Sequence, residues 1–147
     1  MLVKTTSENP DFQTLTRLFD EYLVDIDGEE KDFFAQYNQI YLDHVIVCYE
    51  EGVAVGCGAF KPYEDGVAEI KRMFVLPNQR GKGIAQAILN ELELWAKNTG
   101  YHFCLLETSN KLTNAIALYR KSGYTIIPNY GQYLGVESSV CMKKTIK

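Results

Sequence analysis

The sequence lacks the features that mark membrane, secreted and metal-binding chains. No apolar run reaches the about 18 residues that a membrane-spanning helix needs, and residues 1–11 hold no continuous apolar core of the kind found in secretory signals. No two of the four cysteines lie closer than nine positions, so the chain holds no CxxC motif. The cysteines are Cys48, Cys57, Cys104 and Cys141. We therefore expect a cytoplasmic protein with buried free thiols.

Signals for several other function classes are also missing. The formal net charge of −4 disfavours general binding of nucleic acid, because phosphate contacts need a basic field. No Gly-x-Ser-x-Gly motif is present, which argues against a serine hydrolase. No His, Asp and Glu cluster has metal-ligand spacing, so we expect no metal. The two histidines, His44 and His102, each begin an expected strand away from the motifs below, and we predict structural roles for both.

Strand and helix signals alternate along the chain, and no linker or repeat divides it, so we expect one domain over residues 1–147. Asn9 and Pro10 read as the start of a helix whose apolar positions continue to Ile26. The period changes at residue 44, where two strands about a turn indicate an antiparallel hairpin. The remaining expected elements are a short strand at 1–6, a helix at 29–40, a strand at 67–77, a helix at 84–99, a strand at 102–109, a helix at 114–123, and closing strands at 124–128 and 138–146.

The order of these elements predicts an α/β fold. Antiparallel strands come first, and the strand, helix, strand, helix alternation that follows requires a parallel pair at the centre of the sheet. We therefore predict a mixed, mostly antiparallel sheet with helices on both faces.

Residues 78–89, NQRGKGIAQAIL, join the end of a strand to the start of a helix. The first main-chain N–H groups of a helix lack partners within the helix, and the helix dipole adds partial positive charge there. Gly81 and Gly83 let the backbone approach a bulky anion, and Arg80 and Lys82 add charge. The segment has the composition of a phosphate-binding turn.

Two common nucleotide-binding motifs do not fit this turn. A Walker loop needs a glycine where Leu76 stands and a Ser or Thr where Gly83 stands. A dinucleotide fingerprint needs a third small residue where Gln86 stands, and it expects a preceding parallel strand. A nucleotide-binding protein remains an alternative that stabilisation by ATP or NAD would reveal.

A third pattern, Arg-x-x-Gly-x-Ala, is met by Arg80, Gly83 and Ala85. Preceded by AEIKRMFVLP, it resembles the acyl-CoA motif of the GNAT N-acetyltransferase superfamily. The later TNAIALYRKSGY resembles the second signature of that family, and the two motifs flank HFCLLETS in the family's order. The resemblance covers residues 45–143. It implies the acyl-CoA N-acyltransferase fold, in which the central parallel strand pair splays apart.

The resemblance implies that acetyl-CoA is the co-substrate. The turn would hold the pyrophosphate on its backbone, and the pantetheine arm would pair with the preceding strand like an added strand. Asn114 matches an asparagine that touches the pantetheine, although a helix cap is an alternative role. The implied cofactor-binding residues are Met73, Phe74, Val75, Gln79, Arg80, Gly81, Lys82, Gly83, Ile84, Ala85 and Asn114.

The resemblance also implies two catalytic side chains. Tyr119 matches a tyrosine near the thioester sulfur, where a hydroxyl that is protonated at neutral pH can protonate the departing thiolate. Core packing is its alternative. Glu69 matches a glutamate that serves some members as the base, because an acceptor ammonium must lose a proton before its nitrogen attacks. Its alternatives are an exposed strand position or a salt bridge, with a water chain as base. Glu107 is a weaker candidate for holding an ammonium or capping the following turn.

In the family, the acceptor pocket is formed by the N-terminal helices and the loop before the last strand, here residues 10–41 and 126–139. Both segments are rich in aromatic residues, and the candidate contacts are Phe33, Tyr37, Tyr130 and Tyr133. Tyrosine-lined pockets suit a small amine or an amino acid. Acetylation of a protein amine and an acyl-CoA sensor without turnover stay open as alternatives. We expect no nucleic-acid or membrane partner, and the resemblance leaves a homodimer open.

Overall fold

The computed structural model describes residues 1–27 and 41–146. The second helix that we predict at 29–40, with Phe33 and Tyr37, lies outside the described residues.

The described residues form a seven-stranded sheet in the order β1-β2-β3-β4-β5-β7-β6. Only β4 and β5 pair in parallel, and the other neighbours are antiparallel. This confirms the predicted mixed sheet with a central parallel pair. The strands are β1 (Leu2–Thr5), β2 (His44–Glu50), β3 (Val53–Glu64), β4 (Val67–Val75), β5 (Phe103–Ser109), β6 (Thr125–Ile127) and β7 (Ser139–Thr145).

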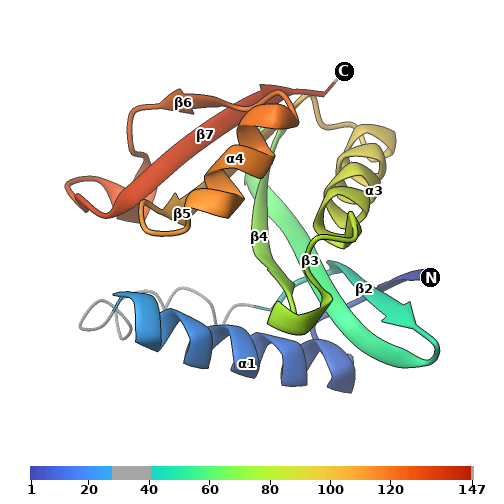
Figure 1. The fold of residues 1–147 in the computed structure, drawn as a ribbon. Helices are drawn as coiled ribbons and strands as arrows, with labels where there is room; N and C mark the ends of the chain where they lie inside the picture. Colours follow the sequence, from blue (N-terminus) through green and yellow to red (C-terminus); the bar gives the residue numbers. More distant parts are fainter. Residues whose placement is uncertain (28–40, 147) are drawn as a thin grey trace.

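Helices cover both faces of the sheet. Figure 1 shows α1 (Pro10–Asp27) on one side and α3 (Ile84–Asn98) and α4 (Thr113–Lys121) on the other. Short 3₁₀ turns lie at Pro77–Gln79 (η2) and Gly131–Tyr133 (η3). Asn9 caps α1 as predicted, because its Oδ1 accepts a hydrogen bond from the Phe12 N–H at 2.9 Å.

Each face of the sheet has its own apolar core. The larger core packs the inner face of α3 against the sheet and includes Ile46, Phe60, Ile88, Leu92 and Met142. The second core lies under α1 and includes Phe12, Leu15, Val47 and Phe74. Because β4 contributes to both cores, it is buried along almost its whole length. Polar side chains on this strand are therefore conspicuous.

The central parallel pair opens after three residues. Val67, Ala68 and Glu69 pair with residues 103–105, and the two strands diverge beyond that point. A bulge in β4 accompanies the divergence, since Ala59 pairs with Lys71 but Cys57 with Phe74. Arg72, in the bulge, adopts a positive φ of 58°. The splayed pair that the resemblance implies is present.

Gly58 lies opposite this bulge and is tightly enclosed. An added Cβ would lie 2.6 Å from the Met73 Sδ and 2.9 Å from side-chain carbons of Ile88 and Leu92. We expect Gly58→Ala to lower the free energy of unfolding by about 1–3 kcal/mol, because it overpacks the core. Urea denaturation measures this. Gly56→Ala is the control. The atoms nearest to a Cβ added at Gly56 would be 3.2 Å away, so this substitution should lower the free energy of unfolding by less. Wild-type stability of Gly58→Ala would contradict the packing described here.

All four cysteines are free and buried, as predicted. Burial raises the thiol pKa of Cys57 and Cys104 to about 12 and that of Cys141 to about 11, and it also raises the pKa of Cys48. Because the thiolate is the nucleophile, iodoacetamide at pH 8 should leave the folded protein unlabelled over the time in which it fully labels glutathione, an exposed reference thiol. Mass spectrometry in urea should then count four adducts. Rapid labelling of the folded protein would be inconsistent with these buried thiols.

Candidate active site

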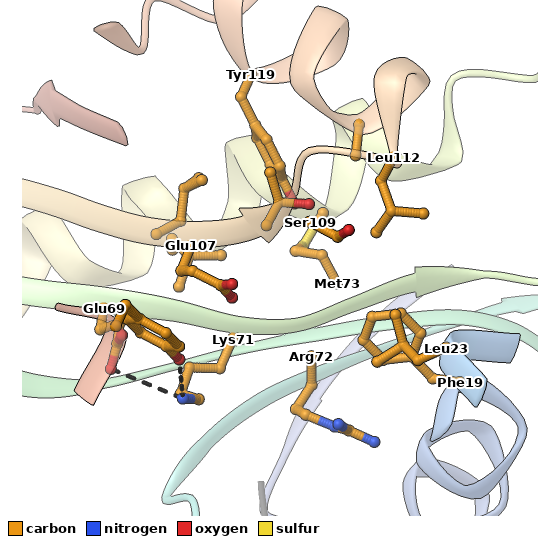
Figure 2. Close-up of a pocket in the computed structure, with 15 residues that line it drawn as sticks. Phe19, Leu23, Glu69, Lys71, Arg72, Met73, Glu107, Ser109, Leu112 and Tyr119 are labelled. Carbon is orange, nitrogen blue, oxygen red and sulfur yellow. Dashed lines mark hydrogen bonds and ion pairs between the residues drawn. The ribbon is translucent and has the colours of Figure 1, made fainter. Parts of the chain in front are cut away.

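A cavity opens where β4 and β5 part. Its walls come from both faces of the sheet, because α1 contributes Phe19 and Leu23 while the α4 side contributes Leu112, Ala115 and Tyr119. Figure 2 shows Tyr119 entering from one side of β4, and Lys71 and Arg72 lying on the other side. The other lining residues are Glu69, Ile70, Met73, Leu106, Glu107, Thr108, Ser109 and Tyr133.

Tyr119 reaches the cavity from α4. The residue is buried, and its ring packs edge-on against Tyr124 with centroids 5.8 Å apart. Burial, and secondarily the charge of Glu107, raise the pKa of Tyr119, so the hydroxyl keeps its proton at neutral pH. The packing alternative and the functional prediction are therefore compatible.

Glu69 lies on β4 with an exposed fraction of only 2%. Its Oε2 accepts a hydrogen bond from the Tyr130 hydroxyl at 2.7 Å, and its Oε1 lies 3.7 Å from the Lys61 Nζ and 3.9 Å from the Lys71 Nζ. The alternative of an exposed strand position is wrong, and the salt-bridge alternative is correct. The same carboxylate also lines the cavity.

Tyr130 and Tyr133, which we predict to contact the acceptor substrate, lie beside the Glu69 carboxylate. Tyr130 donates to Glu69, and its ring contacts Tyr133 edge-on at 5.5 Å between centroids. The Tyr133 hydroxyl accepts a hydrogen bond from the Lys71 Nζ at 3.4 Å. The segment before β7 therefore closes over β4 at Glu69 and Lys71.

Glu107 supplies a second carboxylate, from β5. Its Oε2 accepts a hydrogen bond from the Ser139 hydroxyl at 2.7 Å. In the turn that follows β5, the main-chain N–H of Lys111 donates a hydrogen bond to the Ser109 hydroxyl at 3.2 Å. Figure 2 shows Glu107 between Tyr119 and Lys71, on the cavity side of β5. Glu107 therefore lines the cavity, and its part in holding an ammonium stays a prediction.

The glycine-rich turn presents its backbone to open space. Gly81 and Gly83 have φ values of 80° and 79°, and an added Cβ at either would meet nothing within 4 Å. The main-chain N–H groups of residues 81–86 donate to no acceptor within the described ranges. A row of unpaired donors at the start of α3 is the arrangement that binds an anion.

The cations of this turn are engaged by the protein itself. The Lys82 Nζ donates to the Gln79 Oε1 at 2.7 Å. Arg80 turns toward α1, where its Nη1 donates to the Tyr22 hydroxyl at 3.2 Å, and its Nε donates to the Val75 carbonyl at 3.0 Å. A phosphate contact from Arg80, or pairing of the Val75 carbonyl with a ligand, therefore requires this side chain to move.

The side chains of the other predicted cofactor-binding residues lie in different surroundings. Met73 lines the cavity, whereas Phe74 stacks on Phe19 beneath α1 and Val75 packs in the α3 core. Beyond the point where β4 and β5 diverge, the part of β4 that is available to a ligand is chiefly its main chain. Asn114 is exposed in the first turn of α4, and the N-cap is Leu112, so the capping alternative for Asn114 is wrong.

The family model of the Acetyltransferase (GNAT) family matches residues 12–124. The chain belongs to the GNAT acetyltransferase family. An IAA acetyltransferase of Azospirillum brasilense is 34% identical over 130 residues, which are 86% of this chain and 85% of the relative.

Solved structures agree with the fold. A Klebsiella pneumoniae protein has a TM-score of 0.86 at 27% identity, and the match covers 100% of this chain and 97% of that one. A GNAT acetyltransferase from Elizabethkingia anophelis, solved with acetyl-CoA bound, has a TM-score of 0.72 at 19% identity, covering 99% and 97%. The protein is thus an acetyl-CoA-dependent acyltransferase with the predicted fold.

Among the charged residues of the cavity of this acetyltransferase, sequence reasoning missed Lys71 and Arg72. The available signal was a run of charged residues, EIKR, in a strand that is otherwise apolar. Neither histidine lines the cavity. His44 stacks on Phe60 with centroids 4.4 Å apart, and His102 is exposed. Within residues 1–27 and 41–146, no helix has both the length and the apolar character to cross a membrane.

Proposed function

We propose that this acetyltransferase moves the acetyl group of acetyl-CoA to the primary amine of a small molecule or amino acid. The main support for this proposal is the cavity between the separated strands β4 and β5, which has the Tyr119 hydroxyl on one side and the carboxylates of Glu69 and Glu107 on the other. No cysteine lines this cavity, which favours direct attack within a ternary complex over a covalent acyl-enzyme.

The cofactor lies along the strand-to-helix corner in this proposal. The pyrophosphate accepts hydrogen bonds from the main-chain N–H groups of residues 81–86. The pantetheine arm then pairs with the main chain of residues 73–75, in the gap that β5 leaves open. Its far end reaches the cavity, with Asn114 and Tyr119 on the α4 side.

The acceptor approaches from the α1 face. Glu69 takes a proton from its ammonium group, and the free amine attacks the carbonyl carbon of the thioester. The new C–N bond forms as the C–S bond breaks, the thiolate of coenzyme A leaves, and the proton that the newly acylated nitrogen must still lose passes to solvent. The hydrogen bond from Tyr130 fixes the orientation of Glu69, and Glu107 offers a second negative charge to the ammonium.

Tyr119 stabilises the leaving thiolate. Because burial raises the pKa of Tyr119 above its ordinary value, which already exceeds that of a thiol, complete proton transfer to sulfur is uphill. The hydroxyl therefore acts mainly as a hydrogen-bond donor to the charge that develops on sulfur.

The acceptor is small. The cavity volume is about 90 Å³ and the segment before β7 closes one side, which leaves little room for an extended peptide. The name of the Azospirillum relative, an IAA acetyltransferase, also supports a small-molecule acceptor.

An acceptor screen tests this function. Purified protein is incubated with acetyl-CoA and a panel of amines, and released thiol is measured. Thiol release that depends on a small amine supports the proposal. Thermal stabilisation by coenzyme A without thiol release would instead indicate a sensor, and release only with a protein substrate would indicate a protein acetyltransferase.

A further inference from the structure

Arg72 is a buried cation with donors left over. Its side chain is 2% exposed, and its Nη2 donates to the Thr16 carbonyl at 2.7 Å and lies 3.0 Å from the Asp20 Oδ1. The Nε and Nη1 atoms are buried, and no described residue accepts a hydrogen bond from them. Buried donors are normally satisfied, and leaving those of a charged group unpaired is costly. Such donors in a cavity wall point to a ligand.

Lys71 adds a second buried cation beside it. Its side chain is 6% exposed, and its Nζ makes two long contacts, to the Tyr133 hydroxyl at 3.4 Å and the Glu69 Oε1 at 3.9 Å. An ammonium has three N–H donors and forms its strong hydrogen bonds at shorter distances. Burial lowers the pKa of Lys71, against the opposing effect of Glu69, so this ammonium also lacks full compensation.

The bulge gives these consecutive residues their shared position. Side chains alternate between the faces of a regular strand, but Lys71 and Arg72 both contact residues on the α1 side of β4. The positive φ of Arg72 is uncommon for a residue other than glycine. The ring of Phe19, 5.0 Å from the guanidinium carbon, holds the group in place.

The charges of the cavity wall balance one another. Its lining includes the carboxylates of Glu69 and Glu107 and the cations of Lys71 and Arg72. An acceptor that carries only an ammonium would bring uncompensated positive charge into this buried site. A zwitterion adds no net charge and offers a partner to each sign.

We propose that Arg72, with Lys71 beside it, binds a carboxylate of the acceptor, so that the substrate is an amine of the amino-acid class. This inference rests on the proposed function and narrows its acceptor. The unpaired N–H groups of Arg72 donate to the carboxylate oxygens, while the ammonium end lies toward Glu69 and Glu107. Charge-assisted hydrogen bonds of this kind change affinity by roughly ten- to a hundredfold.

Matched acceptors test the inference. Each α-amino acid is compared with its α-amino amide, which keeps the side chain and amine but loses the negative charge. We expect kcat/KM to be roughly ten- to a hundredfold higher for the acid, mainly through KM. R72M should abolish this preference and K71M should reduce it. K61M is the control: it removes a cation near Glu69 that does not line the cavity, so it should keep the preference.

Because Arg72 also contacts α1, thermal unfolding must show that R72M is folded, and K71M provides an independent test. Equal kcat/KM for acid and amide in the wild type would overturn the inference, as would a preference that survives both substitutions. If no amine is acetylated, the proposed function fails, and calorimetric titration of the coenzyme A complex then decides the inference. Binding of the acid but not the amide, lost in R72M, would support the carboxylate site, and any other binding result would refute it.

Discussion

Replacing Tyr119 by phenylalanine should lower kcat for acetyl transfer by roughly a hundredfold, the lower end of what the loss of one hydrogen-bond donor to a developing negative charge costs. The ring stays packed against Tyr124, so the fold and the cofactor site are preserved. The substitution removes only the hydroxyl, which we propose stabilises the leaving thiolate. KM for acetyl-CoA should change little, because this interaction is made chiefly in the transition state. Steady-state kinetics with thiol detection measure both constants.

Tyr124→Phe is the matched control. The Tyr124 hydroxyl is also buried, but it donates to Glu93 at 2.8 Å, in a cluster with Lys144 outside the cavity. Its loss should lower the free energy of unfolding by about 1 kcal/mol and leave kcat near the wild-type value. Wild-type turnover in Tyr119→Phe would show that the hydroxyl has no part in the chemistry.

Replacing Glu69 by glutamine should also lower kcat/KM by roughly a hundredfold, because the amide cannot take a proton from the acceptor ammonium. The change keeps the side-chain volume and an oxygen that can accept the hydrogen bond from Tyr130. The loss should shrink as pH rises, since an acceptor that is already deprotonated needs no base. The pH profile of kcat/KM, for wild type and variant with one acceptor, measures this.

Glu93→Gln separates catalysis from structure. Glu69 and Glu93 are both buried, and each accepts a hydrogen bond from a tyrosine hydroxyl and lies near a lysine ammonium. Of the two, only Glu69 lines the cavity. We expect Glu93→Gln to retain its kcat/KM after correction for the folded fraction. If the two variants lose activity equally, or if Glu69→Gln is fully active, a water chain rather than Glu69 is the base.

The parts of this molecule that depend on local sequence could be predicted. The cap at Asn9, the hairpin, the helix from Ile84 and the unpaired backbone donors of the glycine-rich turn all follow from short patterns. The parallel pair followed from the order of the elements. The splay of β4 from β5 was implied by the resemblance to a family and not by the residues alone.

Contacts between distant segments could not be predicted. The Tyr130 hydroxyl meets Glu69 across 61 positions, and Arg80 reaches Tyr22 across 58. The position of Arg72 depends on a bulge that places two consecutive side chains on one side of β4. No periodicity rule locates such an extra residue, because it appears only when β4 is paired with β3. The charged run in a buried strand was nevertheless a visible signal.

A crystal structure of the protein with acetyl-CoA tests the central claim most directly. We predict pyrophosphate oxygens within about 2.7–3.2 Å of main-chain nitrogens in residues 81–86, the pantetheine along the open edge of β4, and the sulfur beside the Tyr119 hydroxyl. A cofactor bound elsewhere, with the corner between β4 and α3 left empty at saturating acetyl-CoA, would contradict it.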